Sequence, residues 1–279
     1  MKIPSVVLVV LALGWAIGCS SGPPSPKPGS PGFFWAVARE SYRTGDLVKT
    51  NSTLVELSRS ENEFTARARV WQLVVSAGVS QGFSELADAY EAGARMNLTS
   101  PLRFRNQTAN LRSMAASAAL EFTQAVRETV DFDKGPNVQL AFGYPNGSTA
   151  QPEGLKKISN GIWLPDSERE ALQAALLQRG VLLAVSRAVG SPDDPAKAQA
   201  VFQTAEVRIP RSTFLFGMGK LLYEESDLFG PERMDRPNRL LSMCGEALKA
   251  LQSIPETEDT KMLAGEIQSA IKKLVGPGA

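Results

Sequence analysis

The sequence predicts an all-α protein, either an array of helical repeats or an irregular helical bundle, with one long irregular excursion. Three observations support this fold class. Apolar residues recur at helical spacing from Phe33 onward, Gly- and Pro-rich stretches separate these segments, and no series of alternating strands is present. The chain has 279 residues, of which 43% are hydrophobic and 21% charged, so it can bury a substantial core.

The first segment predicts an exported protein. Val6–Leu13 is an uninterrupted apolar run, and the wider stretch 3–18 is shorter than the roughly 20 residues that span a bilayer. This length is typical of the apolar region of a signal peptide. The run ends in Ala16, Ile17, Gly18 and Cys19, which resembles the lipobox of bacterial lipoproteins. The resemblance implies a signal peptide at residues 1–18 and a lipid on Cys19; the alternative is an uncleaved signal anchor.

A tether follows the lipobox. Residues 19–32 are nearly all Ser, Gly and Pro after the cysteine, a composition that cannot bury apolar surface and forms an extended linker. Acyl chains on Cys19 would anchor the protein to a membrane, at about 0.8 kcal/mol per buried methylene. Ser20 stands where lipoproteins retained at an inner membrane carry Asp. By this resemblance we expect an outer-membrane protein that faces the periplasm, if the cell has two membranes.

Four helices are expected in the first half of the domain. The first carries Phe34, Ala38 and Tyr42, and Gly45-Asp46 ends it. The others are expected over about 47–57, from near Asn62 to Tyr90, and from Pro101 to Val126. Gly78 and Gly82 lie one turn apart on the third, and because glycine destabilises a helix we expect a neighbouring backbone to approach closely there.

Residues 132–165 form the irregular excursion, rich in Gly, Pro and Asn. Val138–Phe142 has the composition of a short strand, without an evident partner. The excursion is too apolar for a disordered linker, so we predict that it folds back on the helices as a lid, with Tyr144 and Trp163 as contact and candidate pocket residues. A mobile surface insertion is the alternative.

Helical periodicity resumes at Asp166, which we expect as an N-cap. The remaining helices are predicted over 166–189, 196–205, 210–227, 238–251 and 258–274, which makes residues 33–279 a single domain with an insertion at 132–165.

Two segments share a repeat-like spacing. Phe34, Ala38 and Tyr42 with the Gly45-Asp46 turn resemble a tetratricopeptide repeat, although Thr50 replaces the usual Ala of the second helix. Leu215, Gly219 and Tyr223 repeat the spacing of the first three positions. Chance matches within an irregular bundle are the alternative. Together with the lipobox, the small-residue third helix and the segment 219–251, the pattern resembles the T-component lipoproteins of TRAP-type solute transporters. This resemblance implies a lipidated partner of a transporter subunit.

Composition excludes several kinds of chemistry. The absence of histidine removes Ser-His-Asp and Cys-His catalysis and most zinc sites, so we expect neither an enzyme nor a cofactor or metal. A net charge near zero gives no sign of nucleic-acid binding. Once Cys19 is acylated, Cys244 is unpaired and lies in an apolar helical stripe, where we expect a buried side chain. Glu224, Glu225 and Asp227 are expected as a solvated helix end rather than a cation site.

The function predicted from these features is a membrane-anchored, non-enzymatic lipoprotein whose helical scaffold binds a protein or peptide of the cell envelope. The alternative is an accessory component that handles a ligand for a TRAP-type transporter. A third possibility, an enzyme, would need two close, buried carboxylates in a pocket or a lysine base.

Overall fold

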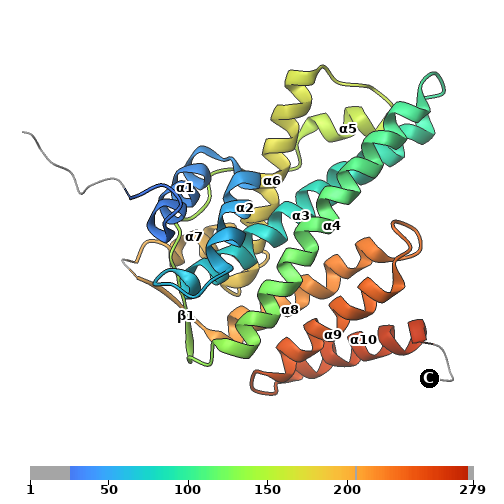
Figure 1. Cartoon of the computed structure of the whole chain (residues 1–279). Coiled ribbons are helices and arrows are strands. Elements are labelled where there is room, and N and C mark those ends of the chain that lie inside the picture. Colours follow the sequence, from blue (N-terminus) through green and yellow to red (C-terminus); the bar gives the residue numbers. More distant parts are fainter. Residues whose placement is uncertain (1–25, 205, 276–279) are drawn as a thin grey trace, which may run out of the picture.

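The computed structural model describes residues 26–204 and 206–275. It is an all-α protein, 72% helical, with ten α-helices in the described part of the chain (Figure 1). A central antiparallel hairpin is formed by α3 (Thr65–Met96) and α4 (Pro101–Phe132), which run side by side through the middle of the molecule. Each has 32 residues, about the length of a whole tetratricopeptide repeat, so the centre of the molecule has the form of an irregular bundle.

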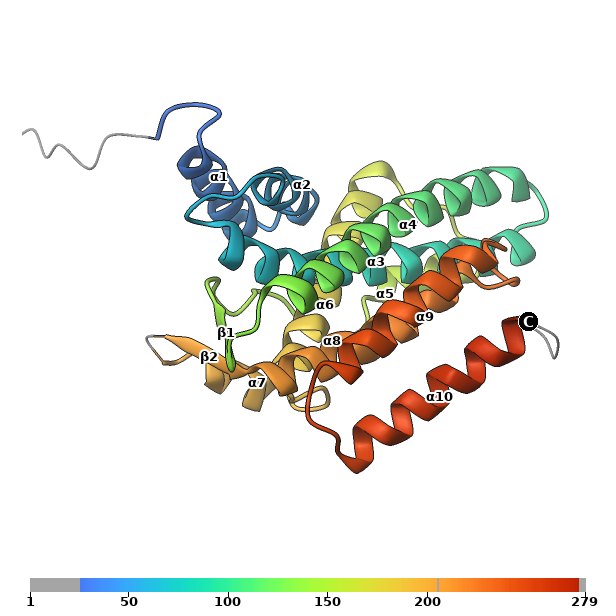
Figure 2. The ribbon, with the colours of Figure 1, turned by 60° about the horizontal axis from the view of Figure 1, so that its bottom comes forward.

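The remaining helices pack around this hairpin. The pair α1 (Pro31–Thr44) and α2 (Leu47–Ser58) lies against α3, and α6 (Asp166–Ala188) crosses it. The pair α8 (Arg211–Ser226) and α9 (Pro237–Gln252) packs on the opposite side, with a 3-10 turn, η1 (Asp227–Phe229), between them. Figure 2 shows α10 (Glu258–Val275) as the outermost layer beside α9. Two short helices, α5 (Glu153–Ser159) and α7 (Pro195–Val201), pack at the two ends of α6.

Local sequence signals set several helix ends. The Ser30 hydroxyl accepts a hydrogen bond from the Phe33 amide at 3.3 Å and caps α1. Gly45 ends this helix in the left-handed conformation (φ 82°), and the Asp46 side chain caps α2 by accepting from the Lys49 amide at 3.1 Å. The prediction that Gly45-Asp46 breaks the helix is confirmed. Asp166, expected as an N-cap, is instead the first residue of α6, and Pro165 holds the cap position.

The predicted close approach at Gly78 and Gly82 is confirmed. A Cβ atom added at Gly78 would lie 2.3 Å from the amide nitrogen of Val181 on α6, and one added at Gly180 would lie 2.1 Å from the Gly78 carbonyl oxygen. Added at Gly82, it would lie 2.8 Å from the Leu176 carbonyl oxygen. Thus α3 and α6 cross with their backbones in contact, which only glycine permits.

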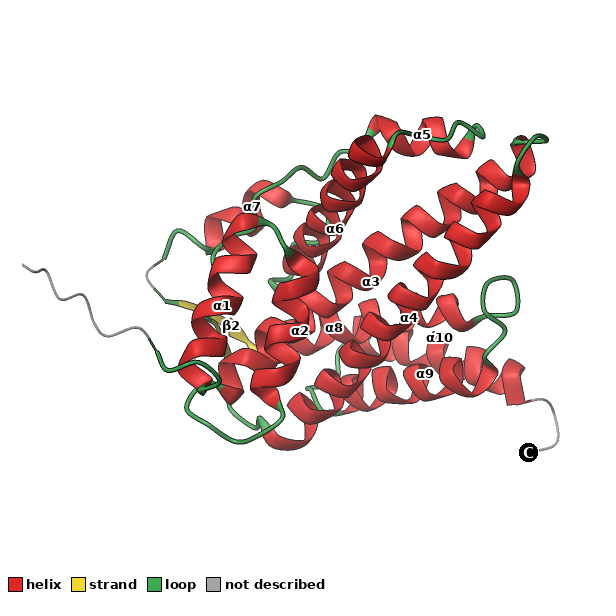
Figure 3. Cartoon of the chain, turned by 45° about the horizontal axis from the view of Figure 1, so that its top comes forward, coloured by secondary structure: helices red, strands yellow, loops and turns green. Residues whose placement is uncertain are grey.

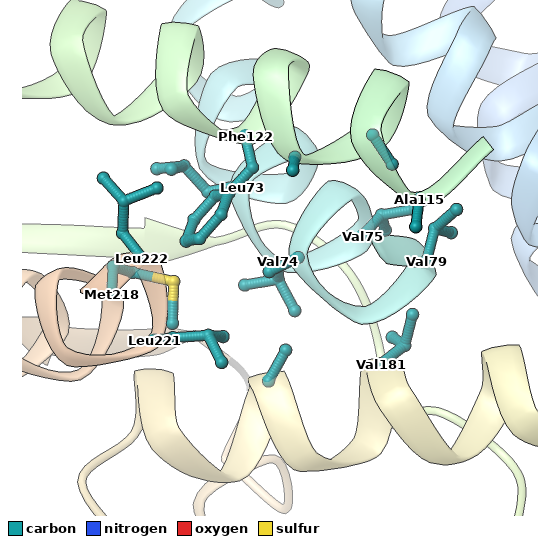
Figure 4. Packing of buried hydrophobic residues seen from close by; sticks show 14 of the residues in the cluster. Leu73, Val74, Val75, Val79, Ala115, Phe122, Val181, Met218, Leu221 and Leu222 are labelled. Atoms are coloured by element: carbon teal, nitrogen blue, oxygen red, sulfur yellow. The ribbon is translucent and has the colours of Figure 1, made fainter. Parts of the chain in front are cut away.

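One hydrophobic core joins the central helices. Figure 4 shows where α3, α4, α6 and α8 meet, and the labelled side chains fill the space between them. A Cβ atom added at Gly219 on α8 would lie 3.4 Å from the Ala247 carbonyl oxygen and 3.5 Å from the Ala250 Cβ of α9, so the two helices pack closely there. The segments with the repeat-like spacing thus each pair with the next helix, α1 with α2 and α8 with α9. Cys244 is fully buried, as predicted, and burial raises the pKa of its thiol.

The prediction that residues 132–165 are irregular is wrong, because the segment contains a strand and a helix. Phe132 is the last residue of α4, and α5 occupies 153–159 with Leu155 and Ile158 buried. Between them, β1 (Asn137–Leu140) pairs antiparallel with β2 (Val207–Pro210), with Val138 opposite Ile209 (Figure 3). The sequence gives no evident partner for β1 because β2 lies about 70 residues later and has only four residues.

Candidate functional site: an aromatic groove

The groove lies between α1, the first turns of α3, the end of β1 with the residues that follow it up to 146, and the segment that leads into β2. Its volume is about 870 Å³, within the range of roughly 300–1,000 Å³ that is usual for ligand pockets. Aromatic side chains from all four segments line it, with arginines at its rim: Trp35, Arg39, Tyr42, Arg43, Arg67, Trp71, Phe142, Tyr144 and Phe202. We call this pocket the aromatic groove.

Trp71 lies beneath the aromatic floor and holds its other rings in place. Its ring stacks on Phe142 at a centroid distance of 5.8 Å and meets the edges of Trp35 at 5.4 Å and Tyr42 at 5.2 Å. Only 1% of Trp71 is exposed, and its indole nitrogen has no hydrogen-bond acceptor among the described residues. Trp35 is only half-buried and forms part of the groove wall.

Two tyrosine hydroxyls fix the segment after β1. Tyr42 on α1 donates to the Gly143 carbonyl at 3.1 Å, and Tyr144 donates to the Pro195 carbonyl at 3.1 Å. The Tyr144 ring also packs on Phe202 at 5.5 Å. Burial raises the pKa of both tyrosines above the usual value of 10, so both hydroxyls remain protonated donors at neutral pH. These contacts are structural, and they tie the groove wall to α1 and α7.

The rim of the groove has unpaired positive charge. Arg39 and Arg67 have no carboxylate within 4.0 Å in the described part of the chain, whereas Arg43 is paired with Glu40. The Arg67 guanidinium lies 5.6 Å from the centroids of Trp35 and Phe64. A cation held over aromatic rings next to an apolar floor suits a ligand that carries an apolar or aromatic group beside an acidic one.

Trp163 lies far from this groove. It packs on Tyr90 and Phe104, and the guanidinium groups of Arg103 and Arg169 lie 3.8 Å and 4.7 Å from the centroid of its ring. On α3, Tyr90 and Trp71 are 19 residues apart, which corresponds to roughly 28 Å along a helix. Tyr144 and Trp163 therefore do not form one site. The excursion does fold back on the helices, with Tyr144 and Trp163 as contact residues as predicted. Its two halves pack on opposite ends of α3, however, so they do not form a single lid over one face.

Other residues singled out in the sequence have structural surroundings. Glu224 forms an ion pair with Arg187, as a solvated helix end would, but the carboxyl group of Glu225 is buried, contrary to expectation. A Cβ atom added at Gly217 on α8 would lie 2.2 Å from the Arg187 carbonyl oxygen of α6, so helix packing explains this glycine. The described residues hold no group of three His, Cys, Asp or Glu side chains placed to share a metal ion. Ala16, Ile17, Gly18 and Cys19 lie outside the described residues, so the lipobox stays a prediction.

Sequence reasoning missed the groove as a site. Phe142 and Phe202 come from segments without clear periodicity, and Arg39 and Arg67 look like ordinary exposed helical residues. The available signal was the density of aromatic residues in the first two helices and the excursion.

Comparisons with known proteins add no relative: no family model, curated protein or solved structure matches the chain. None of the helices in the described residues is long and apolar enough to cross a bilayer.

Proposed function

We propose that this protein is a membrane-anchored, non-enzymatic lipoprotein that binds an extended peptide segment of a cell-envelope protein in the aromatic groove. The observation that carries the proposal is the groove itself, with its aromatic floor and unpaired arginine rim. The lipobox that ends at Cys19 and the Ser/Gly/Pro tether support the membrane anchor, and α1, which borders the groove, follows the tether directly. The outer membrane, on the periplasmic side, is the proposed location.

The chemistry of the groove defines the partner segment. Its floor would accept one or two aromatic or proline side chains, because flat rings pack on Trp and Tyr with little loss of conformational entropy. Each buried aromatic side chain removes about 150–250 Å² from water. Arg39 and Arg67 would attract an adjacent Asp or Glu, which favours an acidic, aromatic peptide over a basic one.

The direct test measures binding of labelled twelve-residue peptides to the detergent-solubilised mature protein by fluorescence anisotropy. The peptide set varies one acidic and one aromatic position. We expect the acidic, aromatic peptides to bind best, and Trp35→Ala and Arg67→Glu to weaken binding about tenfold or more. Arg239→Glu on α9 is the matched control, since Arg239 is exposed, has no carboxylate within 4.0 Å among the residues that the structure describes, and lies outside the groove. Equal binding by all three variants, or no binding by any peptide, would refute the proposal.

A test in cells locates the partner. A photoreactive residue replaces exposed Ala36 in the groove wall, and a control places it at exposed Lys272 on α10. We expect a crosslinked envelope protein at Ala36 that is lost when Arg67→Glu is combined with it. A product that survives Arg67→Glu, or that also forms at Lys272, would count against the groove as the binding surface.

The groove volume also favours the second candidate, an accessory component that holds a small ligand for a TRAP-type transporter subunit. Solute binding and gene neighbourhood distinguish the two functions. Small organic solutes would bind with submillimolar affinity and displace peptide in the second case, and transporter permease genes would be neighbours in the genome.

A further inference from the structure

A second pocket, of about 330 Å³, lies between α3, α6, α8 and the loop before α9. It is polar, and it does not share a residue with the aromatic groove. Its walls include Gln81 on α3 and Glu225 on α8, with the apolar side chains of Leu221 and Leu228 beside them. We call it the Glu225 pocket.

Three oxygen atoms in this pocket lack hydrogen-bond partners. Both carboxyl oxygens of Glu225 and the amide oxygen of Gln81 have less than 1 Å² of accessible surface, and none makes a hydrogen bond of normal geometry with a described residue, although the Ser80 hydroxyl lies near enough to Glu225 to lower the pKa of its carboxyl group. All three can accept hydrogen bonds. Buried polar atoms are nearly always paired, so a group of unpaired acceptors at a pocket indicates a missing donor.

The charged residues around Glu225 are already paired with one another. From α6, Arg179 pairs with Glu85 of α3 at 2.5 Å, and Arg187 pairs with Glu224. From the loop before α9, Arg233 pairs with Asp88 of α3 at 2.8 Å and lies 3.6 Å from exposed Asp227. Each of these arginines thus has a carboxylate of its own, and an ionised Glu225 would have no ion-pair partner within 4.0 Å among the described residues, although the Arg187 charge attracts it.

Burial also disfavours a negative charge on Glu225. Desolvation raises the pKa of its carboxyl group well above 4.5, and the Ser80 hydroxyl and Arg187 offset this only in part. An unoccupied pocket therefore favours the neutral acid, and a bound cation would favour the carboxylate.

We propose that the Glu225 pocket binds a small organic ammonium ion. The ammonium N–H groups donate to Glu225 and to the amide oxygen of Gln81, and the hydrocarbon part lies against Leu221 and Leu228. A primary ammonium nitrogen carries three N–H donors, and the unpaired oxygens of Glu225 and Gln81 are hydrogen-bond acceptors. Binding displaces the proton of Glu225, so affinity rises with pH until the pKa of Glu225 is passed. This site is independent of the aromatic groove and of the peptide proposed there.

Isothermal titration calorimetry on the detergent-solubilised mature protein tests the proposal, with 1,4-diaminobutane as the probe and butane-1,4-diol as the uncharged analogue. We expect the diamine to bind, the diol not to bind, and protons to be released in proportion to the diamine bound. The proton release is measured in two buffers with different ionisation enthalpies, and the titration is repeated at increasing pH.

Two variants assign the binding to the pocket. Glu225→Gln keeps the side-chain size and removes the charge, and Gln81→Leu removes the amide acceptor; each should weaken diamine binding about tenfold or more. Glu170→Gln on α6 is the control, since Glu170 is exposed and outside the pocket, and it should bind as wild type. Circular dichroism verifies that each variant is folded.

The proposal would be overturned by the absence of a heat of binding at roughly 10 mM diamine, by equal binding of the diol, or by unchanged affinity in both pocket variants. Displacement of the diamine by sodium or potassium at equal concentration would also overturn it, because the pocket would then select charge alone.

Discussion

The contact between α3 and α6 allows a sharp test of the packing. Replacing Gly180 by Ala adds a methyl group 2.1 Å from the Gly78 carbonyl oxygen, far inside the separation of about 3.0 Å that real Cβ atoms respect. The carbonyl oxygen belongs to the backbone and the added Cβ atom is bonded directly to it, so neither can move away as the end of a flexible side chain could. The two helices must therefore separate by about 1 Å, and a gap of this size forfeits a quarter to a half of the dispersion energy across the interface.

Two opposing effects decide the magnitude. In a helix, Ala is more favourable than Gly by about 1 kcal/mol. Overpacking of a tight interface costs about 1–3 kcal/mol and more where the backbone must move. At this crossing the steric cost dominates, and we expect Gly180→Ala to lower the free energy of unfolding by about 2 kcal/mol. For a domain of this size, the melting temperature would fall by roughly 4–8 °C.

The assay is urea denaturation followed by circular dichroism, with thermal melting as a second measure. Gly245→Ala on α9 is the matched control, since a Cβ there has no neighbour within 4 Å. It gains the helix propensity without the clash, so its stability should rise by about 0.5–1 kcal/mol. The reasoning is refuted if Gly180→Ala is as stable as wild type, or if both variants change in the same direction.

Four further outcomes are expected. Replacing Cys19 by Ser should release a folded protein from membranes to the soluble fraction, and continued tight membrane association would exclude the lipobox. Limited proteolysis should leave residues 143–160 intact, and Trp163→Ala should lower stability by about 3 kcal/mol; rapid cutting there with unchanged stability would contradict the packing of this segment. Because burial raises the pKa of Glu225, the folded state keeps a proton that the unfolded state releases above about pH 4.5. Stability should therefore fall as pH rises from that value, and Glu225→Gln should remove this loss in urea denaturation; a larger pH dependence in the variant would contradict it. Cys244 should resist a thiol reagent in the native protein and react once the protein is unfolded, whereas fast native labelling would show that the site is open.

The amino-acid sequence by itself determined the fold class and most helices. Their apolar residues repeat every three or four positions, and the signals that end them, such as Gly45 with φ 82°, are local. The close approach at Gly78 followed from the same reasoning, because glycine in a long helix has a cost that only a neighbouring backbone explains. These properties depend on residues within a few positions of one another.

Only the tertiary structure decided which distant segments meet at the helix ends and loops, and which of their side chains become buried. The pairing of β1 with β2 joins segments about 70 residues apart, and neither strand carries a signal of the other. The aromatic groove assembles Trp71 with Phe142 and Phe202 from three such segments. Glu225 lies in an acidic stretch that reads as a solvated helix end, yet α3 covers its carboxyl group. Burial is a property of all the chain segments that surround a side chain, so a local pattern cannot specify it.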